Sequence, residues 1–467
     1  MAVAAERMDD LLDEVASYAR GYLERLSERR VGWTASASEL HRSLGGPLPE
    51  EPSDPRDVIL ELVKAAEPGL AAYGSGRYFG FVMGGATPGS RAADWLASTW
   101  DQCPGLYSVS PAASVVEDIA GVWAAQLLGL PASVSYGFVT GTQMAHFTAL
   151  AAARHQLLRN AGWDAEADGL QGAPRLQVMA GAERHVTVDR AVRFLGVGTR
   201  NLIAVPADDQ GAMRADALAV ALARCDGPTI VCAQAGNINT GSFDPLSEIC
   251  ELAHRSGAWV HIDGAFGLWA AASTGYRRLL DGFEQADSWA VDAHKWLNVP
   301  YDCGLVFTAH PEAHRGAMGV NAGYFIRSEK SLERDGVDWN PELSKRARAL
   351  SVYAAIRELG RTGIADMIER CCSHARLFAE LLGNEAGVEI LNDVVLNQVL
   401  VRFFDDDALT ARVVERVQDD GTCWVGGSTW AEKEVMRISV SNWATTEDDV
   451  ARSVEAIVRA ARWLGGS

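Results

Sequence analysis

The chain has 467 residues, of which 48% are hydrophobic and 22% are charged. This balance is typical of a globular protein with a large core, and the length suffices for two or three domains. The 42 basic and 61 acidic residues give a net charge of −19, which argues against nucleic acids and anionic membranes as partners.

The N-terminal region is predicted to be helical. Apolar residues recur at helical spacing between residues 8 and 29, a linker rich in Pro, Gly and Glu covers 45–55, and a second helix is expected over 55–66. Such a segment has no core of its own and should dock on the main body or on another subunit. The first ten residues lack the layout of a signal peptide, so we expect a cytoplasmic protein.

One uncharged stretch raises the question of membrane insertion. Residues 121–153 contain no Asp, Glu, Lys or Arg, but Pro131, several glycines and Gln126 interrupt them. We therefore expect two buried elements joined by a turn.

The eight cysteines are sparse and form no C-x-x-C motif, so free buried thiols are expected in preference to disulfides or zinc ligands. The histidines form no H-E-x-x-H motif either, and no metal is expected.

From residue 134 to 309, short apolar runs alternate with helical segments. The expected strands cover 175–180, 201–206, 229–235, 259–263, 288–291 and 304–308. The helices expected between them cover 143–158, 215–224, 245–256 and 276–284. This alternation favours a mainly parallel sheet with helices on both faces, in which ligands bind at the carboxyl ends of the strands.

The pattern changes after residue 311. A polar stretch precedes two expected helices, strands follow, and a helix closes the chain, which indicates a smaller α+β domain. The helices are expected over 343–359, 364–382 and 447–463, and the strands over 388–391, 399–403 and 436–440.

The most informative segment is S-W-A-V-D-A-H-K-W-L-N-V-P-Y-D-C-G (288–304). It places Lys295 at the end of an apolar strand, where an unpaired ammonium would be costly to bury. An isolated lysine there would ordinarily reach water. A second segment, W-V-H-I-D-G-A-F-G, ends another strand at Asp263. Pyridoxal 5′-phosphate (PLP) chemistry needs a lysine amine to hold the cofactor and an anion beside its pyridine nitrogen, and this pair can supply both.

Two further segments support the same interpretation. Gly137 to Gln143 (G-F-V-T-G-T-Q) leads directly into a predicted helix, whose free backbone N–H groups can bind a phosphate, although an ordinary helix cap has the same appearance. His185 follows a strand and can stack on a flat cofactor ring, or it can be structural.

Together these segments resemble the group II PLP-dependent amino-acid decarboxylases, a family that includes aromatic amino acid, glutamate, histidine and cysteine sulfinate decarboxylases. The resemblance runs from about Arg77 to the C-terminus. It is strongest in D-A-H-K-W-L-N-V-P-Y-D-C-G and H-I-D-G-A, with support from S-P-A-A-S-V-V-E, G-N-I-N-T-G-S-F-D-P and M-R-I-S-V-S-N-W-A-T-T-E-D-D-V.

The resemblance implies an α/β fold of the aspartate aminotransferase type (PLP fold type I). A mainly parallel seven-stranded sheet would form a large domain, beside a smaller C-terminal α+β domain and an N-terminal helical segment. The implied boundaries are 1–66 for the helical dimerisation segment, 67–310 for the PLP-binding domain, and 311–467 for a mobile loop and the small domain. The resemblance also implies a homodimer with a shared active site.

Residue by residue, the resemblance makes Lys295 the Schiff-base lysine, Asp263 the partner of the ring nitrogen and His185 the stacking and catalytic histidine. The family's phosphate loop, T-S-G-G-[ST]-E-A-N, matches V-T-G-T-Q-M-A-H here, and Gln143 and Met144 depart from it. The cofactor-binding residues implied are Gly141, Thr142, Gln143, His185, Asn237, Asp263, Ala265, Asp292, His294 and Lys295.

A departure affects the expected reaction. In many of these decarboxylases a mobile loop carries a tyrosine, from the neighbouring subunit, that protonates the substrate carbanion. The matching stretch here, S-E-K-S-L-E-R-D-G-V-D-W-N-P (328–341), has no tyrosine, and Gly336 falls near that position. Neither Tyr324 nor Trp339, which flank the loop, can be assigned the role; His185 or a water can supply the proton.

The expected function is decarboxylation of an L-amino acid to the amine and CO₂. The alternatives are oxidative conversion to an aldehyde, which the missing tyrosine suggests, other PLP chemistry such as transamination or lyase cleavage, and a non-catalytic homologue, which the intact Lys295, Asp263 and His185 disfavour. Arg437 can pair with a substrate carboxylate or be structural. Five residues match a region that shapes the substrate pocket in relatives and favour an aromatic or apolar substrate, although most can equally be core: Phe79, Phe81, Met83, Trp100 and Tyr107.

Overall fold

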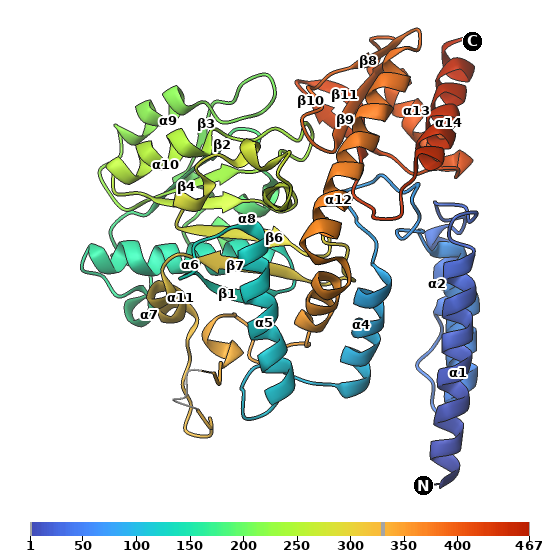
Figure 1. The fold of residues 1–467 in the computed structure, drawn as a ribbon, viewed down its shortest axis with the longest axis horizontal. Coiled ribbons are helices and arrows are strands. Elements are labelled where there is room, and N and C mark those ends of the chain that lie inside the picture. The colour runs from blue at the N-terminus through green and yellow to red at the C-terminus, as the bar shows by residue number, and fades with distance from the viewer. Residues whose placement is uncertain (1, 328–331, 467) are drawn as a thin grey trace.

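The computed structural model describes residues 2–327 and 332–466. Its centre is a seven-stranded sheet with the order β1-β7-β6-β5-β4-β2-β3 (Figure 1). Only β7 runs antiparallel to its two neighbours, and the other pairings are parallel. The strands are β1 (Ser135–Val139), β2 (Gln177–Gly181), β3 (Leu202–Val205), β4 (Thr229–Gln234), β5 (Trp259–Asp263), β6 (Ser288–Asp292) and β7 (Gly304–Thr308).

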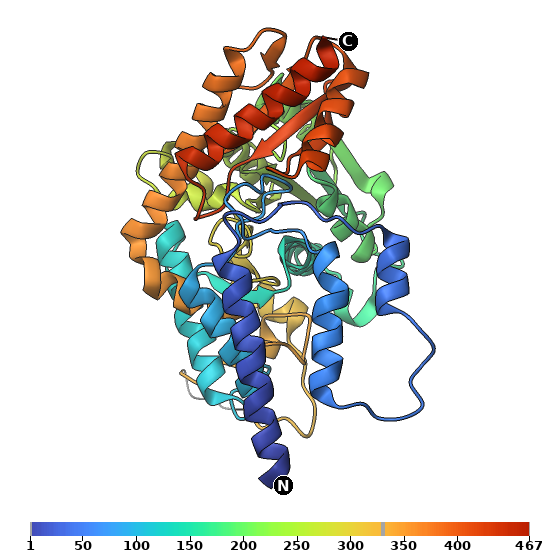
Figure 2. The same cartoon turned by 90° about the vertical axis from the view of Figure 1, so that its right-hand side faces the viewer.

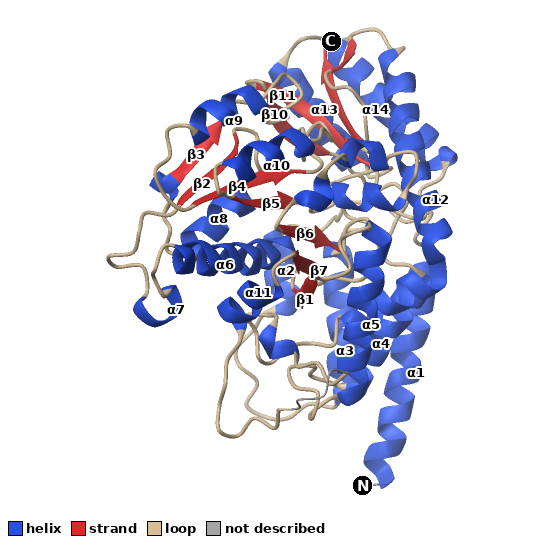
Figure 3. Cartoon of the chain, turned by 60° about the vertical axis from the view of Figure 1, so that its left-hand side comes forward, coloured by secondary structure: helices blue, strands red, loops and turns tan. Residues whose placement is uncertain are grey.

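Helices cover both faces of this sheet (Figure 3). One face packs against α6 (Thr142–Asn160), α8 (Val186–Phe194) and α11 (Pro311–Met318). The other face packs against elements that include α5 (Pro111–Leu128), α9 (Ala215–Leu222) and α10 (Leu246–Arg255). The strands are apolar on both sides because both faces are covered, which is why they appear in the sequence as continuous apolar runs. Two other short elements on this part of the chain are α7 (Ala165–Asp168) and a 3-10 turn at Thr199–Asn201.

A four-stranded antiparallel sheet lies in the C-terminal part of the chain, with the order β10-β11-β9-β8. Its strands are β8 (Val388–Ile390), β9 (Gln398–Phe403), β10 (Gly426–Trp430) and β11 (Lys433–Ser439). The helices α13 (Asp407–Asp420) and α14 (Glu447–Gly465) pack with it. This smaller unit and the seven-stranded sheet confirm the predicted fold class.

The N-terminal helices extend along the outside of the molecule (Figure 2). They are α1 (Ala2–Glu24), α2 (Ala37–Leu44), α3 (Pro55–Ala66) and α4 (Pro88–Trp100). The predicted helices at the start of the chain are present, but α2 and α4 were not predicted. α2 is capped by a Ser36–Glu39 capping box, a local signal that stabilises even a short helix.

Three predictions of local structure need correction. The helix expected over 276–284 is instead two 3-10 turns, Arg277–Leu280 and Phe283–Gln285. The two helices expected over 343–359 and 364–382 form one element, α12 (Ala349–Gly383), interrupted at Gly360, where φ is 61° and ψ is 179°. The segment 121–153 forms three elements, because β1 lies between α5 and α6.

Eight cysteines are present and all are free, six of them buried. Within the described residues, no helix has the length and apolar character needed to cross a bilayer.

Candidate active site

Two neighbouring strands, β5 and β6, carry the charged residues of the candidate site. They pair in parallel with Asp263 opposite Ala290, so Asp263 at the end of β5 and Asp292 at the end of β6 lie at the same edge of the sheet. Lys295 follows three residues later. Carboxyl ends of parallel strands are the usual ligand-binding edge. The sheet therefore brings these three residues together.

The Lys295 amine is paired with Asp292. Its Nζ lies 3.0 Å from Asp292 Oδ2, and its side chain is 18% exposed. Burial opposes ionisation of Asp292, but the neighbouring Lys295 and His294 and the hydrogen bond from Thr142 outweigh it and lower the pKa of that carboxyl. The lysine is therefore held at the sheet edge with its amine still accessible.

Asp292 also connects the lysine to the N-terminus of α6. The backbone N–H of Thr142 donates to Asp292 Oδ1 at 2.6 Å, and Gly141 is the N-cap residue of the helix. A Cβ on Gly304 would lie 2.6 Å from the Gly141 Cα, so this part of the chain has room only for glycine. In the described part of the chain, the buried hydroxyl of Thr142 has no hydrogen-bond partner. An unpaired hydroxyl at a helix N-terminus suits an anion such as phosphate.

Asp263 is buried and is the anion of the site. Its Oδ1 accepts from the Ala265 N–H at 3.1 Å, and its Oδ2 lies 3.4 Å from His146 Nε2. Burial would raise the pKa of Asp263, but the neighbouring His146, His185 and Lys295 lower it well below its ordinary value. The side chain is therefore a carboxylate at neutral pH.

The two predicted histidines lie on different sides of the site. His185 is the N-cap residue of α8, and its Nδ1 lies 2.8 Å from Thr187 Oγ1. His294 accepts from the Cys303 N–H at Nδ1, which places its own proton on Nε2, 3.6 Å from Asp292 Oδ1. Burial lowers the pKa of both, so both imidazoles are neutral at pH 7.

Three other predicted residues make mainly backbone contacts. Gln143 Nε2 donates to Thr187 O at 3.4 Å, which ties α6 to α8. Asn237 is fully buried; it donates to Glu183 O at 3.1 Å and accepts from Asn239 N at 2.8 Å. Ala265 accepts from Asp292 N at 2.9 Å. These contacts fix the segments around the site, and cofactor contacts by these residues stay a prediction.

Sequence reasoning missed two aromatic or imidazole contacts at the site. Tyr301 stacks on His294 with ring centroids 4.2 Å apart. His146 contacts Asp263 from α6. Both residues lie within the quoted motifs, but neither spacing nor composition singles them out, because each contact depends on how distant segments pack.

Arg437, which the sequence offers as a partner for a substrate carboxylate, is a buried residue of β11. In the described part of the chain no hydrogen bond or ion pair engages its guanidinium, and its Nε is unpartnered. Burial lowers its pKa to about 10, so it remains charged at neutral pH. Its charge also contributes to the lowered pKa of His185, after burial, which is the main cause.

The loop region is anchored where it returns to the body of the protein. Residues 328–331 of the predicted loop lie outside the described residues. Asp335 accepts from the Tyr107 N–H at 2.8 Å and pairs with Arg327 at 3.1 Å. A Cβ on Gly336 would lie 2.3 Å from Pro104 O. The position that matches the family tyrosine therefore has no room for a side chain in this arrangement.

The five residues expected near a substrate differ in burial. Phe79 is core, with its ring 4.9 Å from Phe378, whereas Phe81 is 58% exposed and stacks on Trp424 at 5.6 Å. Trp100 is also exposed, and Met83 and Tyr107 are half-buried.

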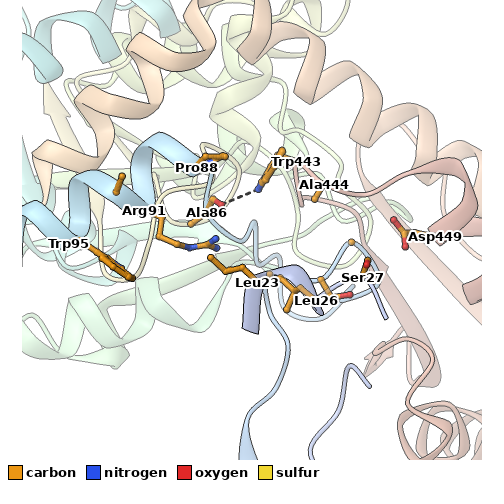
Figure 4. Close-up of a pocket in the computed structure, with 14 residues that line it drawn as sticks. Leu23, Leu26, Ser27, Ala86, Pro88, Arg91, Trp95, Trp443, Ala444 and Asp449 are labelled. Carbon is orange, nitrogen blue, oxygen red and sulfur yellow. Dashed lines mark hydrogen bonds between the residues drawn. The ribbon is translucent and has the colours of Figure 1, made fainter. Parts of the chain in front are cut away.

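A separate cavity of about 560 Å³ lies between the end of α1, the start of α4 and the segment around Trp443 (Figure 4). Leu23, Leu26 and Trp95 give it an apolar lining, and Trp443 Nε1 donates to Ala86 O at its edge. None of the predicted site residues lines it. It is therefore distinct from the candidate active site.

The residues at the sheet edge fit PLP. An accessible amine, a buried carboxylate, a neutral half-buried histidine and an uncapped helix N-terminus with an unpaired hydroxyl surround one region. These are the groups that would hold the aldehyde, the ring nitrogen, the ring face and the phosphate of the cofactor.

Comparison with known proteins agrees with this chemistry. The model of the pyridoxal-dependent decarboxylase conserved domain matches residues 38–404. Tryptophan decarboxylase 1 of Oryza sativa subsp. japonica is 28% identical, over 87% of this chain and 84% of that protein. The aromatic-L-amino-acid decarboxylase of Bacillus atrophaeus is 26% identical, over 96% and 94%.

Among solved structures, Oryza sativa TDC with PLP and tryptamine has a TM-score of 0.91 and 24% identity, covering 98% of both chains. The structural similarity therefore covers the whole fold of this chain. The chain belongs to the pyridoxal-dependent decarboxylase family and is a PLP-dependent amino-acid decarboxylase.

Proposed function

We propose that this enzyme holds PLP covalently through Lys295 Nζ and removes the α-carboxylate of an L-amino acid, giving the amine and CO₂. The observation that carries the proposal is the convergence of the Lys295 amine and the ionised Asp263 at the ends of adjacent strands. When bound, the cofactor accepts the electron pair released as the bond to the carboxylate breaks.

The chain's own residues then have distinct tasks. Asp263 keeps the ring nitrogen protonated, because a buried carboxylate favours a cation beside it. His185 covers the ring face. The N-terminus of α6, with the unpaired Thr142 hydroxyl, binds the phosphate. Neutral His294 donates its Nε2 proton beside it.

Arg437 supports an amino acid as substrate. A buried guanidinium without a partner is costly unless a ligand supplies the anion. A substrate carboxylate provides two oxygens in the geometry that guanidinium binds best. We assign the carboxylate of the substrate to this side chain.

The substrate side chain is proposed to be aromatic. Phe81 and Trp424 stack on each other, and Trp424 also stacks on Tyr78 at 5.0 Å. Of these rings, Phe81 is 58% exposed and offers a face to a flat apolar side chain, whereas Tyr78 and Trp424 are buried behind it. The names of the rice and Bacillus relatives, a tryptophan and an aromatic-L-amino-acid decarboxylase, point the same way.

The test combines a spectrum with product analysis. Purified protein with PLP should show a visible absorbance band that borohydride abolishes, and Lys295→Ala should lack the covalent band. Incubation with a panel of tryptophan, tyrosine, phenylalanine, histidine and glutamate should release CO₂ and the matching amine, fastest from an aromatic substrate. A Lys295→Ala protein with unchanged spectrum and turnover would overturn the proposal.

The aldehyde outcome remains the alternative, because residues 328–341 contain no tyrosine and Gly336 is packed against Pro104. In that case O₂ is consumed, and aldehyde, ammonia and hydrogen peroxide appear with the CO₂. Peroxide detection during turnover separates the two reactions. Amine without peroxide supports decarboxylation alone.

We also propose a homodimer joined through the N-terminal helices. α1 exposes Leu12, and α3 exposes Val58, Leu60 and Leu62. These apolar side chains need a covering surface. Light scattering on the purified protein should give twice the chain mass, and a variant with Leu12 and Leu60 changed to serine should be shifted toward the monomer.

A further inference from the structure

A line of buried polar side chains continues from Asp263 into the interior, away from Lys295. We propose that His146 is a positioning residue, whose Nε2 faces the Asp263 carboxylate at ion-pair distance and whose ring is oriented by His261, Ser288 and Trp259. This inference rests on the proposed role of Asp263 beside the cofactor ring. It adds a residue from α6 to the groups that control that carboxylate.

The contacts form a series in which the link from His146 to Asp263 is at ion-pair distance and the other links are hydrogen bonds. His146 Nε2 lies 3.4 Å from Asp263 Oδ2, and His146 Nδ1 lies 2.8 Å from His261 Nε2. His261 Nδ1 lies 2.9 Å from Ser288 Oγ, which accepts from Trp259 Nε1 at 2.9 Å. The five side chains come from α6, β5 and β6.

The series is shielded from solvent. His146, His261 and Ser288 are fully buried, and Trp259 is 3% and Asp263 5% exposed. Burial lowers the pKa of His261 to about 3, so its ring is neutral and has one N–H. A buried hydrogen-bonded series of this kind has little freedom to rearrange.

The direction of donation follows from the ends of the series. Trp259 can only donate, and ionised Asp263 can only accept. If Ser288 donates to His261 Nδ1, His261 donates from Nε2 to His146 Nδ1, which leaves the His146 proton on Nε2, facing Asp263. Each donor from Trp259 to His261 then has an acceptor within the series.

Both oxygens of Asp263 are thereby held. The Ala265 N–H donates to Oδ1, and His146 Nε2 faces Oδ2. The ionisable groups that act on Asp263 are His146 from α6, His185 before α8 and Lys295 after β6. Of these, His146 has its Nε2 3.4 Å from the carboxylate, so we infer that it helps to fix the direction of that side chain.

The sequence supplies a matched pair of variants. The family's phosphate-loop pattern ends in Asn where this chain has His146. An asparagine amide reaches only the place of the imidazole Nδ1, and so contacts His261 but not Asp263. A glutamine amide reaches the place of Nε2 and retains a donor toward Asp263. His146→Asn therefore removes the contact, and His146→Gln restores it.

The readouts are cofactor affinity of the apoenzyme and the pH midpoint of the bound cofactor's visible absorbance. We expect His146→Asn to weaken PLP binding roughly 10- to 100-fold, the range for one hydrogen bond to a charged group. The midpoint, at which the Lys295 nitrogen loses its proton, should move to higher pH. A ring nitrogen that has lost its own proton no longer repels the positive charge on the Lys295 nitrogen, so that charge persists to higher pH. His146→Gln should stay within about threefold of the wild type.

Controls separate this inference from the proposed function and from misfolding. Lys295→Ala tests the covalent site alone, so an unchanged spectrum there rejects the proposed function, whatever His146 does. His374→Asn, at a buried histidine of α12, should leave affinity and midpoint unchanged. Unchanged affinity and midpoint in a folded His146→Asn protein would overturn the inference, as would a His146→Gln protein that matches His146→Asn.

Ser288→Ala provides an independent arm if His146→Asn does not fold. It removes the donor to His261 without touching Asp263 or the cofactor position. A midpoint shift in the same direction, smaller than that expected for His146→Asn, supports the series. A midpoint equal to that of the wild type contradicts it.

Discussion

At the scale of single residues, charge in the candidate site is balanced locally with one exception. Lys295 has Asp292, and Asp263 has His146. Arg437 has no anion in the described part of the chain, although it is buried. Unpaired buried charges are uncommon in stable proteins because desolvation is not recovered. On the proposed function, Arg437 therefore lowers stability but supplies the charge that binds the substrate carboxylate.

This trade predicts opposite effects of one substitution. Arg437→Met should raise the free energy of unfolding by about 1 kcal/mol, because an uncompensated charge is replaced by an apolar side chain of similar length. It should also lower kcat/KM for the best substrate about 10- to 100-fold, mainly through KM. Urea unfolding and steady-state kinetics measure the two effects.

Arg402 on β9 is the matched control. It is buried like Arg437, but it pairs with Asp407 at 2.9 Å and with Asp405. Arg402→Met should lower stability and leave kcat/KM of the folded enzyme unchanged. If Arg437→Met behaves in the same way, Arg437 is a structural residue.

Sequence reasoning identified residues that end strands better than residues that pack behind them. Lys295 and Asp263 follow apolar runs, and the structure places both at the same edge of the sheet; their roles toward a cofactor stay a prediction. His146 lies in an alanine-rich helix segment with no distinguishing spacing. Its contact with His261 joins residues 115 positions apart, which no local pattern encodes.

At the scale of elements, the strands of the large sheet were predictable because burial on both faces makes them apolar throughout. β10 was missed because its sequence, G-G-S-T-W, lacks that pattern, and it is held by pairing with β11. The turns at 277–280 and 283–285 contain the apolar residues of a helix, but Gly282, at φ 78°, separates them.

The turn at Gly336–Asp338 gives a prediction about the loop. Gly336→Ala should lower the free energy of unfolding by about 1 to 3 kcal/mol, because the added Cβ meets the Pro104 carbonyl, which is backbone and cannot move aside easily. Gly323→Ala is the control, since nothing lies within 4 Å of a Cβ there. Thermal melts of both variants should differ; equal melting temperatures would contradict the packing at Gly336.

The break in α12 gives a second prediction at this scale. Gly360 has φ 61° and ψ 179°, a conformation that is essentially restricted to glycine. Gly360→Ala should cost about 1 to 3 kcal/mol of unfolding free energy even though no atom lies within 4 Å of the new Cβ. Gly383→Ala, at the end of the same helix, should change stability by less than about 1 kcal/mol. Denaturant titration distinguishes the two positions.

At the scale of the whole molecule, buried neutral histidines make the protein sensitive to acid. His314 is fully buried, and it contacts Ser135 Oγ at 2.9 Å and Trp339 O at 3.0 Å. Burial lowers its pKa to about 3. Because the unfolded chain takes up the proton near pH 6.5, the stability that neutral His314 contributes is present above that pH and is lost as the pH falls toward 3.

His314→Gln should therefore make the free energy of unfolding less dependent on pH below neutrality. Between pH 7 and pH 5 the wild type should lose about 2 kcal/mol more unfolding free energy than the variant. The unfolded chain takes up the proton over about 1.5 pH units, from its pKa near 6.5 down to pH 5, and each unit contributes about 1.4 kcal/mol. Urea unfolding at one fixed protein concentration measures this. His41→Gln, at an exposed histidine, should retain the wild-type slope; parallel slopes for all three proteins would contradict the prediction.

The position of β7 has a consequence for synthesis of the chain. β1 has no strand neighbour other than β7, and β7 also separates β1 from β6. While the ribosome is still making residue 303, β1 therefore has no strand to pair with, and only the packing of α6 and the contact from Thr142 to Asp292 can link it to β6. A product that stops before Gly304–Thr308 therefore exposes an unpaired strand beside the helix N-terminus.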